Sequence, residues 1–166
     1  IYTVVRDPHA DGSIGNIQQG TGHMLVFDRS GKLIEKRHEG AFSSPHGLWV
    51  NGDDEIFHAD CGHHTVTKYS LSGDVLMSMG TEGVVGPPGG PFNMCTRATQ
   101  SRDGDIWVSD GYGQNRVHRF TEGGEHILSF GAGVPVFIQA WRGEEITGKA
   151  GTGPGEFNLP HHVLVD

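Results

Sequence analysis

Apolar residues along this chain come in short runs, and each run is bounded by glycine, aspartate, serine or asparagine. In segment 45–80 the pattern predicts four strands, at 47–50, 55–59, 65–69 and 74–79. No segment carries apolar residues at helical spacing over three turns, so no long helix is expected. Short strands separated by closely spaced turn residues are typical of an all-β protein.

The same pattern returns farther along the chain. Segment 45–80 aligns with segment 95–131 after one inserted residue near Asn115, and the alignment places Asp60 on Asp110. Between the third and fourth strands stands a glycine turn that needs a positive φ. These turns are Ser30-Gly31, Ser72-Gly73 and Gly123-Gly124. Four-stranded units that repeat every ~40 to 50 residues predict the blades of a β-propeller.

The repeat divides the chain into blades and one insertion. The divisions are a blade tail at 1–40, blades at 42–90 and 92–131, an insertion at 132–155 and a blade start at 157–166. Closed propellers have about 4 to 8 blades, because closure removes exposed strand edges. This chain has too few blades to close a ring. We therefore expect a fragment cut from a longer protein or, as the alternative, self-association of copies.

The insertion is apolar in its first part and rich in glycine in its second part. Long loops on a rigid scaffold often carry binding functions. The insertion therefore predicts either a surface loop that packs on its own blade or a lid over one mouth of the central channel.

Charge, hydrophobicity and cysteine content limit the kinds of partner and crosslink that the chain is expected to have. The net charge is −8, and the 12 Lys and Arg residues are scattered, so nucleic acid is not expected to bind. No apolar run approaches the roughly 20 residues that span a bilayer, so no membrane span is expected. Two cysteines, Cys61 and Cys95, either pair or remain as buried thiols.

Two Pro-His cassettes occupy equivalent places in their blades: Pro45-His46 and Pro160-His161. The middle blade has Thr96 where the histidine would stand. First strands of propeller blades line the central channel, so His46 and His161 are expected to point toward one axis. Three such imidazoles would leave one open position on a tetrahedral Zn²⁺ ion. The alternative is structural, with proline starting the strand and histidine bonding a neighbouring carbonyl.

Tyr112 stands in the loop between the second and third strands of its blade, and the equivalent loop at 61–64 has no tyrosine. This loop is expected on the same face of the ring as the cassettes. Arg6 ends the opening strand in a similar register. A phenol and a guanidinium near a metal suit a proton acceptor and an anion clamp. The alternative for both residues is an ordinary turn or strand end.

The other histidines are expected mostly in loops or on polar strand faces. They are His9, His23, His38, His58, His63, His64, His118, His126 and His162. The run Cys61-Gly62-His63-His64 looks like a metal cluster, but no second cluster matches it, and we interpret it as a turn.

The Phe-x-x-Pro-His-Gly-Leu cassette, the Ser-Asp-Gly-Tyr motif around Tyr112 and the Gly-Pro-Gly-Glu-Phe-Asn-Leu-Pro-His run resemble the peptidyl-α-hydroxyglycine α-amidating lyase family. That family consists of six-bladed propellers built from NHL repeats. The resemblance covers nearly the whole chain apart from the insertion. It implies that about three of the six blades are present here, and it favours a secreted or periplasmic location.

The resemblance also implies roles for individual residues. His46 and His161 match two of the family's three zinc ligands, Tyr112 matches its catalytic base, and Arg6 matches a substrate-binding arginine by position. The carbonyl of Leu48 matches a ligand of a structural Ca²⁺ ion. Two departures stand out, because animal members have a disulfide cysteine where this chain has Gly113, and an aspartate where it has Arg97.

The resemblance thus implies a zinc-dependent carbon–nitrogen lyase that cleaves a peptidyl-α-hydroxyglycine to a peptide amide and glyoxylate. A small molecule or peptide would be its substrate. The alternative is a noncatalytic NHL propeller that binds a protein or a glycan. A calcium-dependent lactonase is a third possibility, but it needs carboxylates and asparagines facing the channel, and the cassette strands carry few of them.

Overall fold

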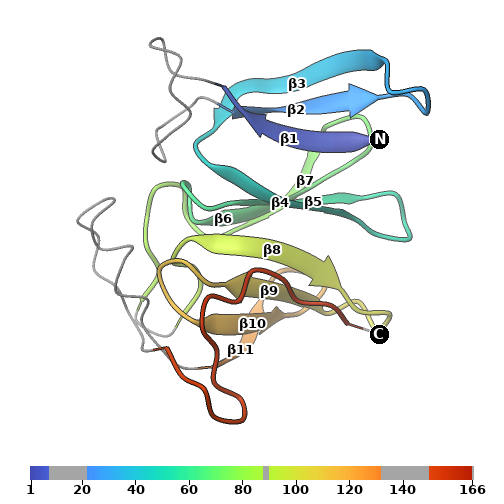
Figure 1. The fold of residues 1–166 in the computed structure, drawn as a ribbon. Helices are drawn as coiled ribbons and strands as arrows, with labels where there is room; N and C mark the ends of the chain where they lie inside the picture. Colours follow the sequence, from blue (N-terminus) through green and yellow to red (C-terminus); the bar gives the residue numbers. More distant parts are fainter. Residues whose placement is uncertain (8–21, 88–89, 132–149, 166) are drawn as a thin grey trace.

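The computed structural model of the protein describes residues 1–7, 22–87, 90–131 and 150–165 (Figure 1). These residues form eleven strands and no helix. In chain order the strands are β1 (Tyr2–Arg6), β2 (Gly22–Phe27), β3 (Leu33–Phe42), β4 (Pro45–Val50), β5 (Ile56–Asp60), β6 (Thr65–Tyr69), β7 (Val75–Met79), β8 (Cys95–Gln100), β9 (Ile106–Asp110), β10 (Arg116–Phe120) and β11 (His126–Phe130).

The strands form three antiparallel sheets, and in each sheet neighbouring strands are consecutive in the chain. The first sheet has the order β1-β2-β3, the second β4-β5-β6-β7 and the third β8-β9-β10-β11. Figure 1 shows the sheets stacked in sequence order, from the first sheet in blue to the third in yellow and orange. The all-β prediction is confirmed, and so are the four strands expected in segment 45–80, to within two residues at each end.

Apolar side chains between the stacked sheets form the core. One cluster joins the second and third sheets, with Phe57 and Val66 on one side and Ala98 and Ile106 on the other. A second cluster, which includes Met24, joins the first and second sheets. The second sheet therefore packs against the first sheet on one side and the third on the other, and the burial of these apolar side chains fixes the relative positions of the three sheets.

The three glycine turns take the backbone conformation expected of them. Gly31, Gly73 and Gly124 have φ angles of 83°, 96° and 84°. Each glycine N–H donates to the carbonyl three residues earlier, for example Gly73 to Ser70 at 3.0 Å. A side chain at such a φ is strained, so glycine at these turns is a local requirement of the hairpin.

The C-terminal part of the chain lies beside the third sheet. Residues 157–165, expected to begin a further blade, form no strand but run along β8 (Figure 1). The Thr96 hydroxyl donates to the Pro160 carbonyl at 3.0 Å, and the Thr99 hydroxyl donates to the Val163 carbonyl at 3.3 Å. The segment has no neighbouring strand among the described residues with which to form a ladder. Most of the insertion, 132–149, lies outside the described residues.

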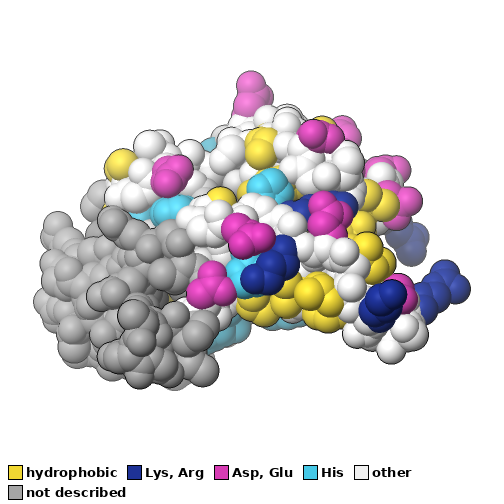
Figure 2. Space-filling model, turned by 90° about the horizontal axis from the view of Figure 1, so that it is seen from above, with side chains coloured by type: hydrophobic (Ala, Val, Ile, Leu, Met, Phe, Trp, Pro, Cys, Tyr) yellow, Lys and Arg dark blue, Asp and Glu magenta, His cyan; other side chains and the backbone are white. Residues whose placement is uncertain are grey.

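Several other expectations concern the surface and the thiols. Cys61 and Cys95 remain buried thiols and form no disulfide. On the face drawn in Figure 2, acidic side chains are spread over the surface and Lys and Arg stand at separate places. Within the described ranges, the protein has no helix that could cross a membrane.

Candidate metal and catalytic site

The Asp60 carboxylate fixes the chain just before the first cassette. Asp60 ends β5 and is buried, and its two oxygens accept hydrogen bonds from the N–H groups of Ser43 and Ser44, each at 2.8 Å. The pairing of β4 with β5 then shifts register at His46. A bulge at this point turns the side chain out of the regular alternation of the strand. β8 has the same shift at Thr96, which confirms that the two positions are equivalent.

The His46 ring is oriented by a backbone carbonyl of the next sheet. Its Nδ1 lies 2.9 Å from the Thr96 carbonyl oxygen, and its Nε2 lies 3.1 Å from the Tyr112 hydroxyl. A carbonyl only accepts, so Nδ1 carries the proton and Nε2 accepts from the phenol. Gly47 permits this approach, because a Cβ there would collide with the Thr96 carbonyl. Burial lowers the pKa of His46, and the charges of His161 and Arg6 act in the same direction.

His161 reaches the same place from the C-terminal cassette. Its ring centroid lies 5.5 Å from that of His46 and 4.7 Å from that of Tyr112. Its Nδ1 donates to the Leu159 carbonyl at 3.0 Å, so Nε2 keeps its lone pair. Metal-binding histidines commonly donate the other ring N–H to a carbonyl in this way. The two cassettes therefore present two imidazoles with the same tautomer, and His161 is exposed.

Tyr112 packs against both histidines, and the three rings form a triangle. Its ring meets those of His46 and His161 edge-on, at 76° and 88°. Glycine on each side is required by close packing, since a Cβ at Gly111 would strike the Pro160 backbone and one at Gly113 would strike Asn93. Burial raises the pKa of Tyr112, and the positive charge of Arg6 opposes that shift.

The structure thus brings His46, His161 and Tyr112 into contact and places Arg6 within electrostatic reach of two of them. Arg6 is exposed at the end of β1. Leu48 lies on β4 opposite His58 and packs against the apolar cluster of the first and second sheets. One carbonyl is a small part of the six to eight oxygen ligands that Ca²⁺ takes.

The donor set fits part of a zinc site. Within residues 1–7, 22–87, 90–131 and 150–165, no group of three or more His, Cys, Asp or Glu side chains is arranged to hold a metal ion. His46 and His161 provide two imidazole ligands, and a catalytic zinc takes three protein ligands.

The run 61–64 is a turn, as interpreted from the sequence. The Cys61 thiol donates to the Cys95 carbonyl at 2.8 Å, and His64 Nδ1 accepts from the Met94 N–H at 3.0 Å. His63 lies 3.5 Å from the Asp60 carboxylate. These contacts join the second sheet to the start of the third.

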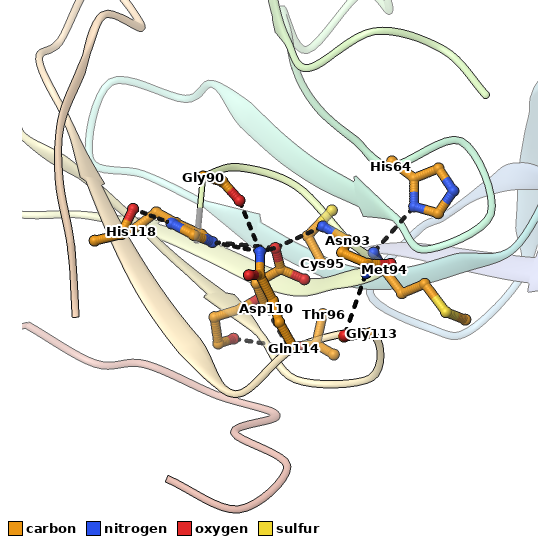
Figure 3. Close-up of polar contacts among 12 residues, drawn as sticks. His64, Gly90, Asn93, Met94, Cys95, Thr96, Asp110, Gly113, Gln114 and His118 are labelled. Carbon is orange, nitrogen blue, oxygen red and sulfur yellow. Dashed lines mark hydrogen bonds and ion pairs between the residues drawn. The ribbon is translucent and has the colours of Figure 1, made fainter. Parts of the chain in front are cut away.

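The expected placement is wrong for three strand histidines, one of which is His23 on β2 with an exposed fraction of 5%. His58 on β5 and His118 on β10 are buried, with exposed fractions of 2% and 0%. β5 and β10 are inner strands of stacked sheets, and a polar residue in such a strand does not mark a solvent face. His118 bonds the buried carboxylate of Asp110, in a network that also includes Gln114 and Asn93 (Figure 3). The repeated strand-end aspartate was the one available sequence signal for this network.

Arg97 occupies the place of Gly47 in the third sheet. It is half-buried, forms no ion pair with the described residues, and its Nε has no hydrogen-bond partner among them. Burial lowers the pKa of its guanidinium. Burial and the positive charge of Arg97 lower the pKa of His162, which directly follows His161.

Comparison with known proteins places this site in context. No family model matches the chain. Mouse NHL repeat-containing protein 3 is 29% identical over 154 residues, which are 86% of this chain and 39% of the relative. A probable peptidyl-alpha-hydroxyglycine alpha-amidating lyase of Caenorhabditis elegans is 28% identical over 141 residues, 84% of this chain and 36% of the relative. Peptidyl-alpha-hydroxyglycine alpha-amidating lyase 1 of Drosophila melanogaster is 31% identical over 128 residues, 76% and 24% respectively.

Solved structures agree on the fold. A streptogramin B lyase structure matches with a TM-score of 0.51 at 17% identity, over 78% of this chain and 44% of that one. The calcium-binding protein regucalcin from Agrobacterium tumefaciens also has a TM-score of 0.51 at 17% identity, over 68% and 37%. Both are β-propellers, and the propeller prediction is confirmed. The chain spans about two fifths of the length of its NHL-repeat relatives, at 39% and 42%.

Proposed function

Because the chain is homologous to NHL-repeat proteins and to peptidyl-α-hydroxyglycine α-amidating lyases, we propose that it carries part of the active site of a zinc-dependent lyase. The reaction would cleave the N–C bond of a peptidyl-α-hydroxyglycine and release a peptide amide and glyoxylate. The observation that carries the proposal is the contact of His46, His161 and Tyr112, which three separate segments of the chain supply.

His46 and His161 would bind the zinc through Nε2, because carbonyls occupy Nδ1 of both rings. When bound, zinc supplies Lewis acidity that lowers the pKa of a coordinated hydroxyl group. A third protein ligand is needed from residues other than those described. A structural Ca²⁺ ion bound in part by the Leu48 carbonyl is a further element of the proposal.

Tyr112 would transfer the proton. Nε2 of His46 cannot both accept from Tyr112 and bind a metal, so the phenol becomes available to the substrate when a metal is bound. As phenolate, Tyr112 takes the proton of the substrate hydroxyl, and that oxygen forms the carbonyl of glyoxylate as the C–N bond breaks. Tyr112 would then give this proton to the leaving amide nitrogen, which restores the phenolate, so no net proton is gained or lost.

The charges around the site suit a substrate with a carboxylate. The two ionic groups that act on His46 are His161 and Arg6, and both disfavour its protonated form. Arg97, on the innermost strand of the third sheet, adds a half-buried guanidinium with no carboxylate partner among the described residues. Arg6 would hold the substrate carboxylate or the developing negative charge, since a guanidinium binds a carboxylate with two parallel hydrogen bonds.

The experiment combines zinc content with product formation. A protein that comprises this chain and the remaining blades of the propeller is loaded with zinc, dialysed and assayed for glyoxylate release from a peptide that ends in α-hydroxyglycine. We expect stoichiometric zinc and glyoxylate formation. A zinc-loaded protein that releases no glyoxylate would overturn the reaction, and a protein that retains no zinc would overturn the metal site.

A noncatalytic NHL-repeat module is the second candidate. It is favoured by the match to NHL repeat-containing protein 3 of mouse and human, whose name states a repeat and no reaction. Such a module would bind a protein or glycan and would show neither zinc retention nor glyoxylate release in the same experiment.

A further inference from the structure

A buried carboxylate stands directly before the loop that carries Tyr112. Asp110 ends β9, and its Oδ2 accepts from the Asn93 N–H at 2.7 Å and from the Gln114 side-chain amide at 2.8 Å. His118 Nε2 donates to the same oxygen at 3.1 Å (Figure 3). The Asp110, Gln114 and His118 side chains are fully buried. Hydrogen bonds to a charged acceptor in such surroundings are the strong ones.

His118 links this carboxylate to the outer strand of the sheet. Its Nδ1 accepts from the Ser129 hydroxyl at 2.6 Å, so both ring nitrogens have partners. Ser129 in turn accepts from His126 Nε2 at 2.7 Å. The chain Ser129–His118–Asp110 therefore crosses the third sheet from β11 to the end of β9.

The network continues into the backbone on both sides of Tyr112. The Gly113 N–H donates to the Asn93 carbonyl at 3.0 Å, and the Asn93 side chain donates to the Gly113 carbonyl at 3.2 Å. Asn93 is itself bonded to Asp110. The backbone is thus held at Asp110 and at Gly113, with Tyr112 between them.

The same loop also supports the second histidine cassette. The Asn115 side chain accepts from the Leu159 N–H, and the Leu159 carbonyl accepts from His161 Nδ1 at 3.0 Å. A displacement of the loop would therefore move Tyr112 and His161 together.

The second sheet has an aspartate at the same place but not the same support. Asp60 accepts from the backbone N–H groups of Ser43, Ser44, Gly62 and His63. The position equivalent to His118 is Thr67, whose hydroxyl pairs with Ser78 at 3.4 Å. Asp60 also has an imidazole beside it, His63 of its own turn at 3.5 Å, but the next strand of its sheet supplies none.

An Asp–His–Ser chain also invites comparison with a hydrolase triad, but the arrangement is unsuited to that role. His118 has no exposed surface, and its two nitrogens are already bonded to Asp110 and Ser129. In a hydrolase triad Nδ1 faces the carboxylate and Nε2 faces the serine, and here the two are exchanged.

We propose that His118 is a positioning residue: bonded to Asp110, it fixes loop 111–115 so that Tyr112 stays in contact with His46 and His161. Its catalytic consequence rests on the proposed lyase function. The geometric consequence does not, because ring contacts are measurable without turnover.

The test replaces His118 by the residue of the second sheet, in His118→Thr. The nuclear Overhauser contact between the Tyr112 and His46 rings, which belong to different sheets, the hydrogen exchange of the Gly113 amide, and turnover are measured. We expect loss of the ring contact, faster exchange at Gly113 and a fall in kcat on the order of a hundredfold. His118→Gln, which can donate to Asp110 and accept from Ser129, is expected to restore part of each signal.

Thr67→Ala on β6 is the matched control and is expected to leave the ring contact and the Gly113 exchange rate unchanged. If His118→Thr does not fold, Ser129→Ala is the second test, because it leaves the His118–Asp110 bond in place, removes only the bonds of Ser129 to His118 and His126, and should still speed Gly113 exchange. A folded His118→Thr variant that keeps both the ring contact and the wild-type exchange rate would overturn the proposal, as would unchanged exchange in Ser129→Ala. Absence of glyoxylate with the wild-type protein would instead count against the lyase function.

Discussion

The second and third sheets share one design and differ at the positions that bear on chemistry. β4 carries His46 where β8 carries Thr96, although both strands bulge at that point. The β5–β6 loop is a turn tied by Cys61 and His64, whereas the β9–β10 loop carries Tyr112. The comparison shows that the repeated blade keeps its turns and bulges, while single substitutions decide which blade carries the histidine and which carries the tyrosine of the proposed site.

The second and third sheets also carry their buried histidine on different strands. The second sheet has His58 on β5 opposite Thr67 on β6, and the third has Val108 on β9 opposite His118 on β10. His118 is bonded on both sides, whereas Nε2 of His58 has no hydrogen-bond partner among the described residues. One imidazole therefore belongs to a hydrogen-bonded network, whereas the other packs against the Phe42 ring and leaves Nε2 without a partner among the described residues.

The largest effect is expected at the cassette histidine of the second sheet. His46→Ala should remove most of the bound zinc and with it the turnover, because two or fewer imidazoles hold the ion poorly. Elemental analysis after dialysis measures the metal. His63→Ala, in the turn of the same sheet, is the control and should retain zinc. Equal zinc in wild type and His46→Ala would remove His46 from the ligand set.

The second-largest effect on activity is expected when Tyr112 of the β9–β10 loop loses its hydroxyl group. Tyr112→Phe should reduce kcat by about 10²–10⁴-fold, the usual contribution of a positioned proton acceptor, and should leave zinc content as in wild type. Glyoxylate release with saturating substrate gives the rate. A variant that turns over like the wild type would exclude Tyr112 from proton transfer.

A smaller effect is expected on the stability of the protein in acid, and it should come from His58 in the second sheet. Burial lowers the pKa of His58 to about 4, Asp60 opposes that shift, and His38 and His63 add to it. In the unfolded chain a histidine titrates near 6.5. The unfolded state therefore takes up a proton first as the pH falls, so this contribution to stability is complete above pH ~6.5 and is lost between about 6.5 and 4.

His58→Val, which copies Val108 of the third sheet, should flatten the pH dependence of the unfolding free energy over that window. The change is expected to be on the order of 3 kcal/mol across the window. Urea unfolding at a series of pH values measures it. A pH dependence identical to that of the wild type would show that the acid sensitivity comes from other groups.

The smallest effect is expected for the ion pairs that both sheets share. Lys68 pairs with Glu55 at 3.0 Å in the second sheet, and Arg119 pairs with Asp105 in the third. Each cation also lies over an aromatic ring, Phe57 or Trp107. Partly exposed pairs of this kind contribute about 1 kcal/mol or less, so Glu55→Gln and Asp105→Asn should each shift the unfolding free energy by no more than that. Thermal unfolding of the two variants checks whether the sheets respond alike, and a larger loss in one of them would mark a difference between the two pairs.

Much of the site could be predicted from residue order alone. The cassettes identified His46 and His161, and the added residue in the β9–β10 loop drew attention to Tyr112. Their contact could not be predicted, because it depends on the glycines at 47, 111 and 113 letting backbones from different segments approach. The spacing of these glycines in the sequence does not indicate which neighbouring segment each of them contacts.

The sequence by itself determined the short strands and the turns that connect them. Gly31, Gly73 and Gly124 stand where a hairpin needs a positive φ, and that requirement acts within a few residues. Only the tertiary structure decided the place of His118. The inner strands β5 and β10 are largely buried whereas the outer strands β7 and β11 are largely exposed, so whether a polar residue meets solvent or a carboxylate depends on the place of its strand and on the sheet stacked against it.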